Sequence, residues 1–251
     1  MTEETQKDVA TVVLVHGAFA DGSSWSGVIE RLQAKGVAVT APANPLRGIS
    51  ADSAYLSSVL GQIEGPVILV GHSYGGAVIT NAATDAANVV GLVYVAAFAP
   101  DEGEVLGAVS ASSKDSVLNS ALVPRQYPNA DGGSATEFAI DPAKAREAFA
   151  GDLSDQQAAL IAAVQRPIAE LAFSEPNGPP AWKQKPSWAV VATGDKAAGT
   201  DIVRSMAERA GAHITELDGS HVIMISQPDA VTGVIMEAVA AVGSPVGTMG
   251  G

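Results

Sequence analysis

The chain has 251 residues, a length that suits one large α/β domain or a domain that carries an insertion. Apolar residues make up 47% of it and charged residues only 16%, so it can bury a core and lacks the composition of a disordered protein. Its 14 basic and 27 acidic side chains give a formal net charge of −13. No Lys or Arg cluster offsets this charge, which argues against nucleic acid and anionic membrane surfaces as partners.

The chain contains no cysteine, so disulfides, thiolate zinc sites, iron–sulfur clusters and a cysteine nucleophile are ruled out. The first eight residues are acidic and polar, whereas a secretory signal peptide starts with a basic and then an apolar region. No stretch approaches the roughly 18 uninterrupted apolar residues that a membrane helix needs. We therefore expect a soluble, cytoplasmic protein.

Strand-like and helix-like segments alternate along most of the chain. Apolar residues at helical spacing separate short β-branched runs, and helices are expected at 77–87, 201–210 and 229–241. Strands joined by single helices require right-handed crossovers and form a parallel sheet. We therefore predict an α/β fold with a mainly parallel six-stranded sheet flanked by helices. The six predicted strands are 11–15, 37–40, 67–70, 89–97, 188–192 and 213–217.

The strand signal disappears between the fourth and fifth predicted strands. This stretch contains Ser- and Gly-rich loops and helix-like pieces at 142–150 and 154–164. We expect residues 101–185 to form a helical cap over the carboxyl edge of a core made of residues 1–100 and 186–251. The alternative is a long excursion with no role in binding. The tail from Gly243 to Gly251 is expected to be disordered.

A Gly-x-Ser-x-Gly sequence lies between the third predicted strand and the helix that follows it. Gly71 and Gly75 flank Ser73, and only such small neighbours allow the sharp, strained turn that presents a serine hydroxyl. The N–H groups at the start of the next helix would face a developing negative charge. The pattern predicts that Ser73 is a nucleophile. The alternative is a glycine-rich turn that packs the helix against the sheet.

A serine hydroxyl needs a base to take its proton, and the chain has four histidines. His72 is adjacent to Ser73, so its side chain should point elsewhere, and His213 begins a strand at the wrong end of the sheet. His16 is placed to brace the loop after the first strand. His221 follows the last strand at the correct edge, so we predict it to be the base; a purely structural histidine is the alternative.

The base in turn needs a carboxylate that fixes its tautomer and stabilises the imidazolium. Asp195 follows the fifth predicted strand through Thr193 and Gly194, which brings it to the same edge as His221. We favour Asp195 as this acid. Other acidic residues remain open as alternatives, namely Asp101, Glu102 and Asp218.

Two N–H donors are required for the oxyanion of a tetrahedral intermediate. We predict one at Tyr74, directly after the nucleophile, and the other at Ala18 in the loop after the first strand, where Gly17 lets the backbone turn. An acyl-binding pocket is expected under the cap. Its predicted aromatic lining is Phe19, Tyr74, Phe98, Phe138 and Phe149.

With these residues assembled, the chain resembles the α/β-hydrolase superfamily over nearly its whole length. It looks most like bacterial carboxylesterases related to the plant methylesterase and hydroxynitrile lyase group. The resemblance implies a Ser-His-Asp enzyme with no cofactor or metal, a helical cap, small apolar ester substrates, and oxyanion donors at Ala18 and Tyr74. Lyases of this group carry a lysine after the catalytic histidine, where this chain has Val222. The motifs that carry the resemblance are Leu14-Val15-His16-Gly17-Ala18, Gly71-His72-Ser73-Tyr74-Gly75-Gly76, Tyr94-Val95-Ala96-Ala97-Phe98-Ala99-Pro100-Asp101, Thr193-Gly194-Asp195 and Gly219-Ser220-His221.

The sequence thus predicts a serine hydrolase that cleaves small, fairly apolar carboxylic esters through an acyl-enzyme. The contrasting hypothesis is a receptor-like ligand-binding protein that keeps the same residues but turns over little. Thioesterase, lactonase, amidase and perhydrolase activities use the same residues, and the fold does not decide among them. A small-molecule ester is the expected partner, and monomer or dimer is left open.

Overall fold

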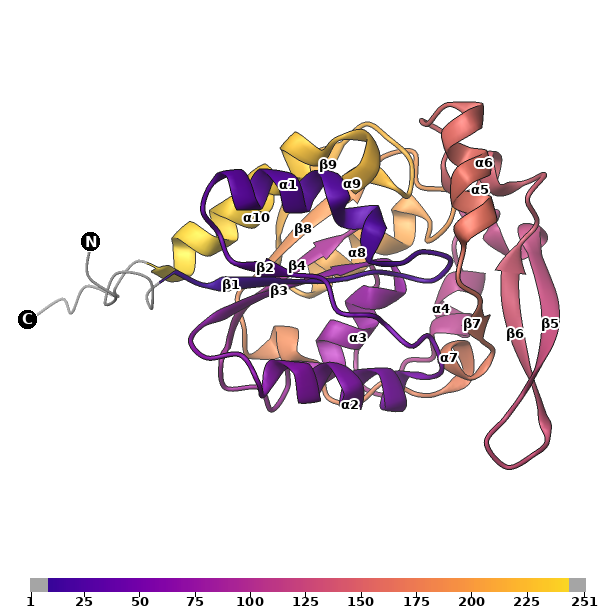
Figure 1. Cartoon of the computed structure of the whole chain (residues 1–251), viewed down its shortest axis with the longest axis horizontal. Helices are drawn as coiled ribbons and strands as arrows, with labels where there is room; N and C mark the ends of the chain where they lie inside the picture. Colours follow the sequence, from indigo (N-terminus) through magenta and orange to yellow (C-terminus); the bar gives the residue numbers. More distant parts are fainter. Residues whose placement is uncertain (1–8, 244–251) are drawn as a thin grey trace, which may run out of the picture.

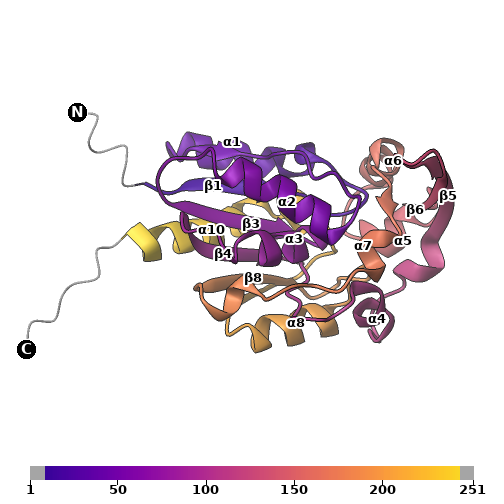
Figure 2. The same cartoon turned by 90° about the horizontal axis from the view of Figure 1, so that it is seen from below.

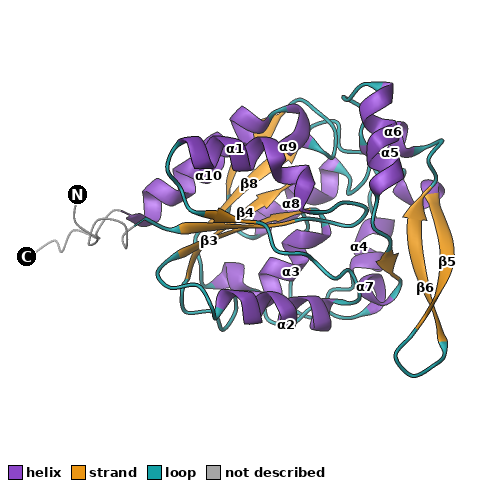
Figure 3. Ribbon diagram, viewed as in Figure 1, coloured by secondary structure: helices purple, strands orange, loops and turns teal. Residues whose placement is uncertain are grey.

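The computed structural model describes residues 9–243 and centres on one parallel sheet (Figures 1 and 3). All five strand pairings in this sheet are parallel, in the order β2-β1-β3-β4-β8-β9. The predicted six-stranded parallel sheet is therefore confirmed. Its strands are β1 (Thr11–Val15), β2 (Val39–Thr40), β3 (Val67–His72), β4 (Val89–Val95), β8 (Ser187–Ala192) and β9 (His213–Leu217).

Helices cover both faces of the sheet. In Figure 1, α1 and α10 lie together on one face and α2 and α3 lie together on the other. The central strands are buried on both sides, as their near-continuous apolar runs require. The helices of the core are α1 (Ser26–Ala34), α2 (Ile49–Leu60), α3 (Tyr74–Ala82), α8 (Thr200–Arg209), α9 (Ile223–Ser226) and α10 (Pro228–Gly243), with the short 3₁₀ helix η2 (Gly22–Trp25) before α1.

One helix start differs from the sequence expectation. α3 runs over Tyr74–Ala82 rather than 77–87, because it begins directly after the Ser73 turn. α2 has Gly48 as its N-cap, which has no side chain to accept a bond from the helix. The Asp52 carboxylate provides the cap instead, because it accepts the backbone N–H of Arg47 (3.1 Å) and of Gly48 (3.4 Å).

The segment between β4 and β8 is not a purely helical cap, so that part of the prediction is wrong. It contains a three-stranded antiparallel sheet in the order β5-β6-β7. Pro124 and Pro128 hid β5, because proline argues against a central strand but is tolerated on an edge strand. The elements are α4 (Leu106–Ala111), η3 (Leu118–Ala121), β5 (Leu122–Pro128), β6 (Ser134–Ile140), α5 (Ala145–Phe149), α6 (Asp155–Val164), β7 (Ile168–Ala169), α7 (Leu171–Ser174) and η4 (Ala181–Lys183).

This segment lies beyond the carboxyl ends of the core strands, opposite the end where β1 begins (Figures 1 and 2). Backbone bonds fasten it to the core: the N–H of Ala169 donates to the Leu46 carbonyl at 2.9 Å, and that of Phe19 to the Arg166 carbonyl at 3.1 Å. The domain boundaries at 100/101 and 185/186 remain a prediction. The expected disorder after residue 243 falls outside the described residues.

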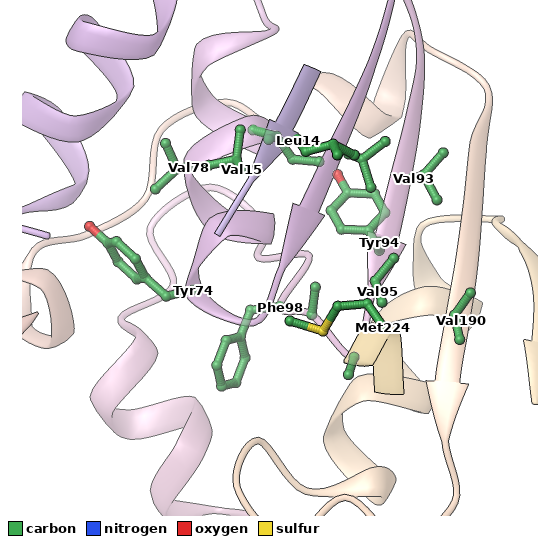
Figure 4. Packing of buried hydrophobic residues seen from close by; sticks show 14 of the residues in the cluster. Leu14, Val15, Tyr74, Val78, Val93, Tyr94, Val95, Phe98, Val190 and Met224 are labelled. Atoms are coloured by element: carbon green, nitrogen blue, oxygen red, sulfur yellow. The ribbon is translucent and has the colours of Figure 1, made fainter. Parts of the chain in front are cut away.

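A continuous apolar core runs from the sheet to the edge where the predicted site residues lie. Figure 4 shows Leu14, Val93 and Val95 packed in this core, with Phe98 at its end. Within residues 9–243, no helix has the length and apolar character needed to span a membrane.

Candidate active site

Ser73 occupies a strained turn between β3 and α3. Its φ of 53° and ψ of −124° lie outside the regions that side chains favour, which costs about 1–3 kcal/mol. The glycines on either side are sterically required. A Cβ at Gly71 would lie 2.6 Å from the Gly75 carbonyl oxygen, and one at Gly75 would lie 2.5 Å from the Val15 carbonyl oxygen. The Gly-x-Ser-x-Gly pattern is therefore a tight elbow.

His221 and Asp195 meet at the carboxyl edge of the sheet, as predicted. His221 Nδ1 lies 2.8 Å from Asp195 Oδ2, and both side chains are buried. The other carboxylate oxygen, Oδ1, accepts the backbone N–H of Ala197 at 2.9 Å and of Ala198 at 3.0 Å. These bonds hold the carboxylate as an acceptor for Nδ1–H, the tautomer that leaves Nε2 free to accept a proton.

The alternative acids lie elsewhere. Asp101 pairs with Lys183 at 2.5 Å, and Asp218 accepts a bond from Thr193 Oγ1 at 3.4 Å. Within residues 9–243, the side-chain hydrogen bonds of His221 include neither of these residues nor Glu102. Asp195 is therefore the acid that geometry places beside this histidine.

Ser73 and His221 line one small cavity, although no hydrogen bond joins their side chains within residues 9–243. Such bonds are often long before substrate arrives. Phe19, Phe98 and Phe149 line this cavity, and their role in binding an acyl group stays a prediction. Phe138 does not line it; it packs on Phe173, with ring centroids 6.3 Å apart, and Phe173 takes the place at the wall. The complete lining is Ala18, Phe19, Ser73, Tyr74, Phe98, Ser110, Leu118, Phe149, Phe173, Ala198 and His221.

The loop after β1 packs directly against Ser73. A Cβ at Gly17 would lie 2.6 Å from Ser73 Cβ, so only glycine permits this approach. The N–H of Phe19 is engaged by the Arg166 carbonyl at 3.1 Å. By contrast, within residues 9–243 the N–H groups of Ala18 and Tyr74 donate to no protein acceptor, and both residues line the cavity. These are the two predicted oxyanion donors.

Two further histidines support the site without facing the cavity. His16 Nδ1 donates to the Gly17 carbonyl at 2.9 Å, and its Nε2 accepts the N–H of Asn44 at 2.9 Å, which braces the loop as predicted. His72 Nε2 lies 2.9 Å from the His221 carbonyl oxygen. Burial lowers the pKa of both histidines, that of His72 well below 6.5, so His72 is neutral and donates this bond. Sequence reasoning missed this role of His72.

Sequence reasoning also missed Asp52, whose carboxylate is fully buried. The Tyr74 hydroxyl donates to Asp52 Oδ2 at 2.7 Å. Burial raises the pKa of Asp52, and the bond from Tyr74 opposes that rise. Tyr74, the residue after Ser73, is thus tied to the start of α2. The only sign of Asp52 in the sequence is that it is an acidic residue in the first turn of an apolar helix.

His, Asp and Glu side chains of the described chain form no group of three or more that could hold a metal ion. The site therefore consists of a serine, a His–Asp pair and two free N–H groups around an apolar cavity.

Known proteins share this architecture. The pyrethroid hydrolase from Sphingobium faniae JZ-2 superposes with a TM-score of 0.75 at 21% identity, over 93% of this chain and 98% of that one. The methylesterase MES16 from Arabidopsis gives 0.76 at 20% identity, over 93% and 100%. Polyneuridine aldehyde esterase gives 0.74 at 20% identity, over 91% and 98%. At this level of identity the likeness establishes the fold.

A sequence relative is the carbendazim hydrolyzing esterase from Nocardioides sp. (strain SG-4G), 38% identical over 114 residues. The match covers 40% of this chain and 47% of the relative, so it spans about half of that protein. A family model described as the alpha/beta hydrolase family matches residues 12–234, nearly the whole of the described chain. The chain belongs to the alpha/beta hydrolase family.

Proposed function

We propose that the protein is a serine esterase that hydrolyses small, fairly apolar carboxylic esters. The observation that carries this proposal is the buried contact of 2.8 Å between His221 Nδ1 and Asp195 Oδ2, beside a cavity shared with Ser73. The relatives point to the same class of reaction, since their names include esterase, methylesterase and pyrethroid hydrolase.

In the first half of the reaction, Ser73 Oγ attacks the ester carbonyl carbon and His221 Nε2 takes the hydroxyl proton. The Asp195 carboxylate stabilises the resulting imidazolium through Nδ1–H. The negative charge moves to the carbonyl oxygen, where the N–H groups of Ala18 and Tyr74 donate to it. Each donor of this kind is worth about 10²–10³-fold in kcat.

Collapse of the tetrahedral intermediate breaks the bond to the leaving alcohol, which receives the proton from His221 Nε2. An acyl group then remains on Ser73. Water attacks this acyl-enzyme, gives a proton to the same nitrogen, and a second collapse returns the proton to Ser73 Oγ and releases the carboxylic acid. Every proton transfer uses His221, so the proposal requires no cofactor.

A fluorophosphonate tests the proposal, because it forms a stable adduct only with an activated serine. We expect one adduct by intact mass, mapped to Ser73, and its formation should slow by about 10³-fold or more in His221→Ala. His213→Ala is the matched control, since His213 is exposed on β9 and its one ring contact within residues 9–243 is with Trp188. No adduct, or equal labelling in the two variants, would favour the receptor-like hypothesis and reject the esterase.

A further inference from the structure

The cavity that holds Ser73 is too small to contain an ester by itself. Its volume is about 10 Å³, on the order of the space that one water molecule needs. A second, outer pocket of about 260 Å³ lies next to it, between the cap helix α6 and the core. A cavity of roughly 150 Å³ suffices to bind a benzene ring, so the outer pocket has room for an aromatic or branched group.

Two phenylalanines form the wall between these spaces, because Phe19 and Phe149 line both. Their rings meet edge to face, with centroids 6.1 Å apart and planes at 84°. Phe19 is fixed, since its backbone has a φ of 60° and its N–H is bonded to the Arg166 carbonyl. Phe149 closes the wall from the last position of the five-residue helix α5, where its side chain is buried between Phe19 and His221.

The chemistry of the outer pocket selects neutral, apolar groups. Asp21 is the one charged side chain among its lining residues, and its carboxylate is engaged by the N–H (2.7 Å) and the hydroxyl (2.5 Å) of Ser23. The hydroxyls of Ser24 and Ser26 bond to backbone carbonyls of their own turn. The full lining is Phe19, Ala20, Asp21, Ser23, Ser24, Ser26, Gly27, Phe149, Leu153, Gln157, Leu160, Ile161, Val164, Val222 and Ile225.

Exposed apolar side chains continue this lining to the surface. On α6, Leu160 is 62% exposed and Val164 is 52% exposed, although both belong to the pocket wall. Large apolar groups left in water next to a concave site are typical of a ligand entrance.

The pocket lies on the histidine side of the site. Val222 follows His221 directly and Ile225 lies one turn further on, and the Phe149 ring is 5.0 Å from the His221 ring between centroids. The leaving alcohol must accept its proton from His221, so the alcohol part of an ester occupies this side of Ser73.

We infer that the outer pocket binds the alcohol part of the substrate as a neutral aromatic or branched apolar group, and that Phe149 controls which alcohols reach Ser73. This inference rests on the proposed esterase function and adds the substrate class to it. It predicts a preference for bulky alcohols over small ones at a constant acyl group.

The test compares kcat/KM for benzyl acetate and ethyl acetate, measured as acetate release. Ile161→Trp fills the outer pocket, and Ala159→Trp is its matched control, because Ala159 is exposed on the same helix outside the lining. We expect the benzyl-to-ethyl ratio to fall about tenfold or more in Ile161→Trp and to stay constant in the control. Phe149→Leu, which shortens the gate without removing it, should raise the ratio. Unchanged ratios in Ile161→Trp and Phe149→Leu would overturn the inference.

Two further measurements separate the inference from the function it rests on. If Ile161→Trp changes the ratio of ethyl butyrate to ethyl acetate and leaves the benzyl-to-ethyl ratio alone, the pocket takes the acyl group and the inference is wrong. Calorimetry of benzyl alcohol with Ser73→Ala protein needs no turnover. Binding that is weakened about tenfold by Ile161→Trp, and not by Ala159→Trp, supports the pocket even where fluorophosphonate labelling rejects the esterase. Absent or equal binding overturns it.

Discussion

The buried bond between Tyr74 and Asp52 should make an unusually large contribution to stability for a single hydroxyl. The acceptor is a carboxylate with no exposed surface, and it accepts the tyrosine hydroxyl at 2.7 Å and otherwise backbone N–H groups of Arg47 and Gly48. Removal of a hydrogen bond to a buried charged group costs about 1.5–3 kcal/mol. We therefore expect Tyr74→Phe to lower the free energy of unfolding by about 2 kcal/mol.

Tyr94 supplies a matched control, because it is equally buried and also makes one side-chain hydrogen bond. Its hydroxyl lies 2.8 Å from Thr80 Oγ1, a neutral group that itself donates to the Gly76 carbonyl at 2.8 Å. Tyr94→Phe should therefore cost only about 0.5–1.5 kcal/mol. Both tyrosines belong to the buried core, and Tyr→Phe keeps each ring, so the comparison isolates the two hydroxyls (Figure 4).

Urea denaturation at pH 7 measures the difference. With a slope m of about 3 kcal/mol/M, a loss of 2 kcal/mol moves the midpoint by roughly 0.7 M. A double-mutant cycle with Asp52→Asn isolates the pair, and we expect a coupling energy of about 1 kcal/mol or more, since a neutral acceptor gains less from the hydroxyl. The Tyr74–Asp52 bond would not make the contribution claimed for it if Tyr74→Phe and Tyr94→Phe lowered the free energy of unfolding equally. The same holds if the cost of Tyr74→Phe were unchanged in the Asp52→Asn background.

Other expectations concern the pH dependence of stability and the loop after β1 that packs against Ser73. Burial holds the pKa of His72 well below 6.5 in the folded protein, so as the pH falls the unfolded chain binds this proton first. The stability that is present above pH 6.5 should therefore be lost as the pH falls, by up to about 1.4 kcal/mol per pH unit. Urea unfolding at several pH values should show a smaller slope in His72→Gln. Gly17→Ala should lower kcat about 10²-fold or more, because the new Cβ would lie 2.6 Å from Ser73 Cβ and would displace the N–H of Ala18, the proposed oxyanion donor. Gly233→Ala, which meets open space, should leave kcat unchanged, and equal rates in the two glycine variants would contradict this account.

Local sequence signals were sufficient for the parallel sheet and for the placement of Asp195 and His221 at one edge of it. Apolar runs separated by helical spacing define strands and crossovers, and parallel strands bring all their carboxyl ends to one edge. Residues that directly follow these strands therefore lie at the same edge of the sheet. This is why Asp195 and His221 could be paired from sequence, at a contact that the structure gives as 2.8 Å.

The cap could not be predicted in the same way. Among the described residues, β5 pairs with β6 alone, and β6 pairs with β5 and β7. Every side chain of β5 and most of those of β6 are exposed or half-buried, so neither strand shows a strong period-two pattern. Phe138 was expected to line the cavity because it is an aromatic residue in the cap segment. Packing of the cap places Phe173 there instead and leaves Phe138 behind it.

Local sequence patterns were enough to predict three features: the strained turn at Ser73, a histidine and an aspartate after the later strands, and a glycine in the loop after β1. Each depends on local backbone geometry, which neighbouring residues encode. Three other features emerge only in the folded chain: the bond from His72 to the His221 carbonyl, the Tyr74–Asp52 pair and the outer pocket behind Phe149. These join segments distant in sequence, and such contacts depend on how whole elements pack rather than on any local pattern.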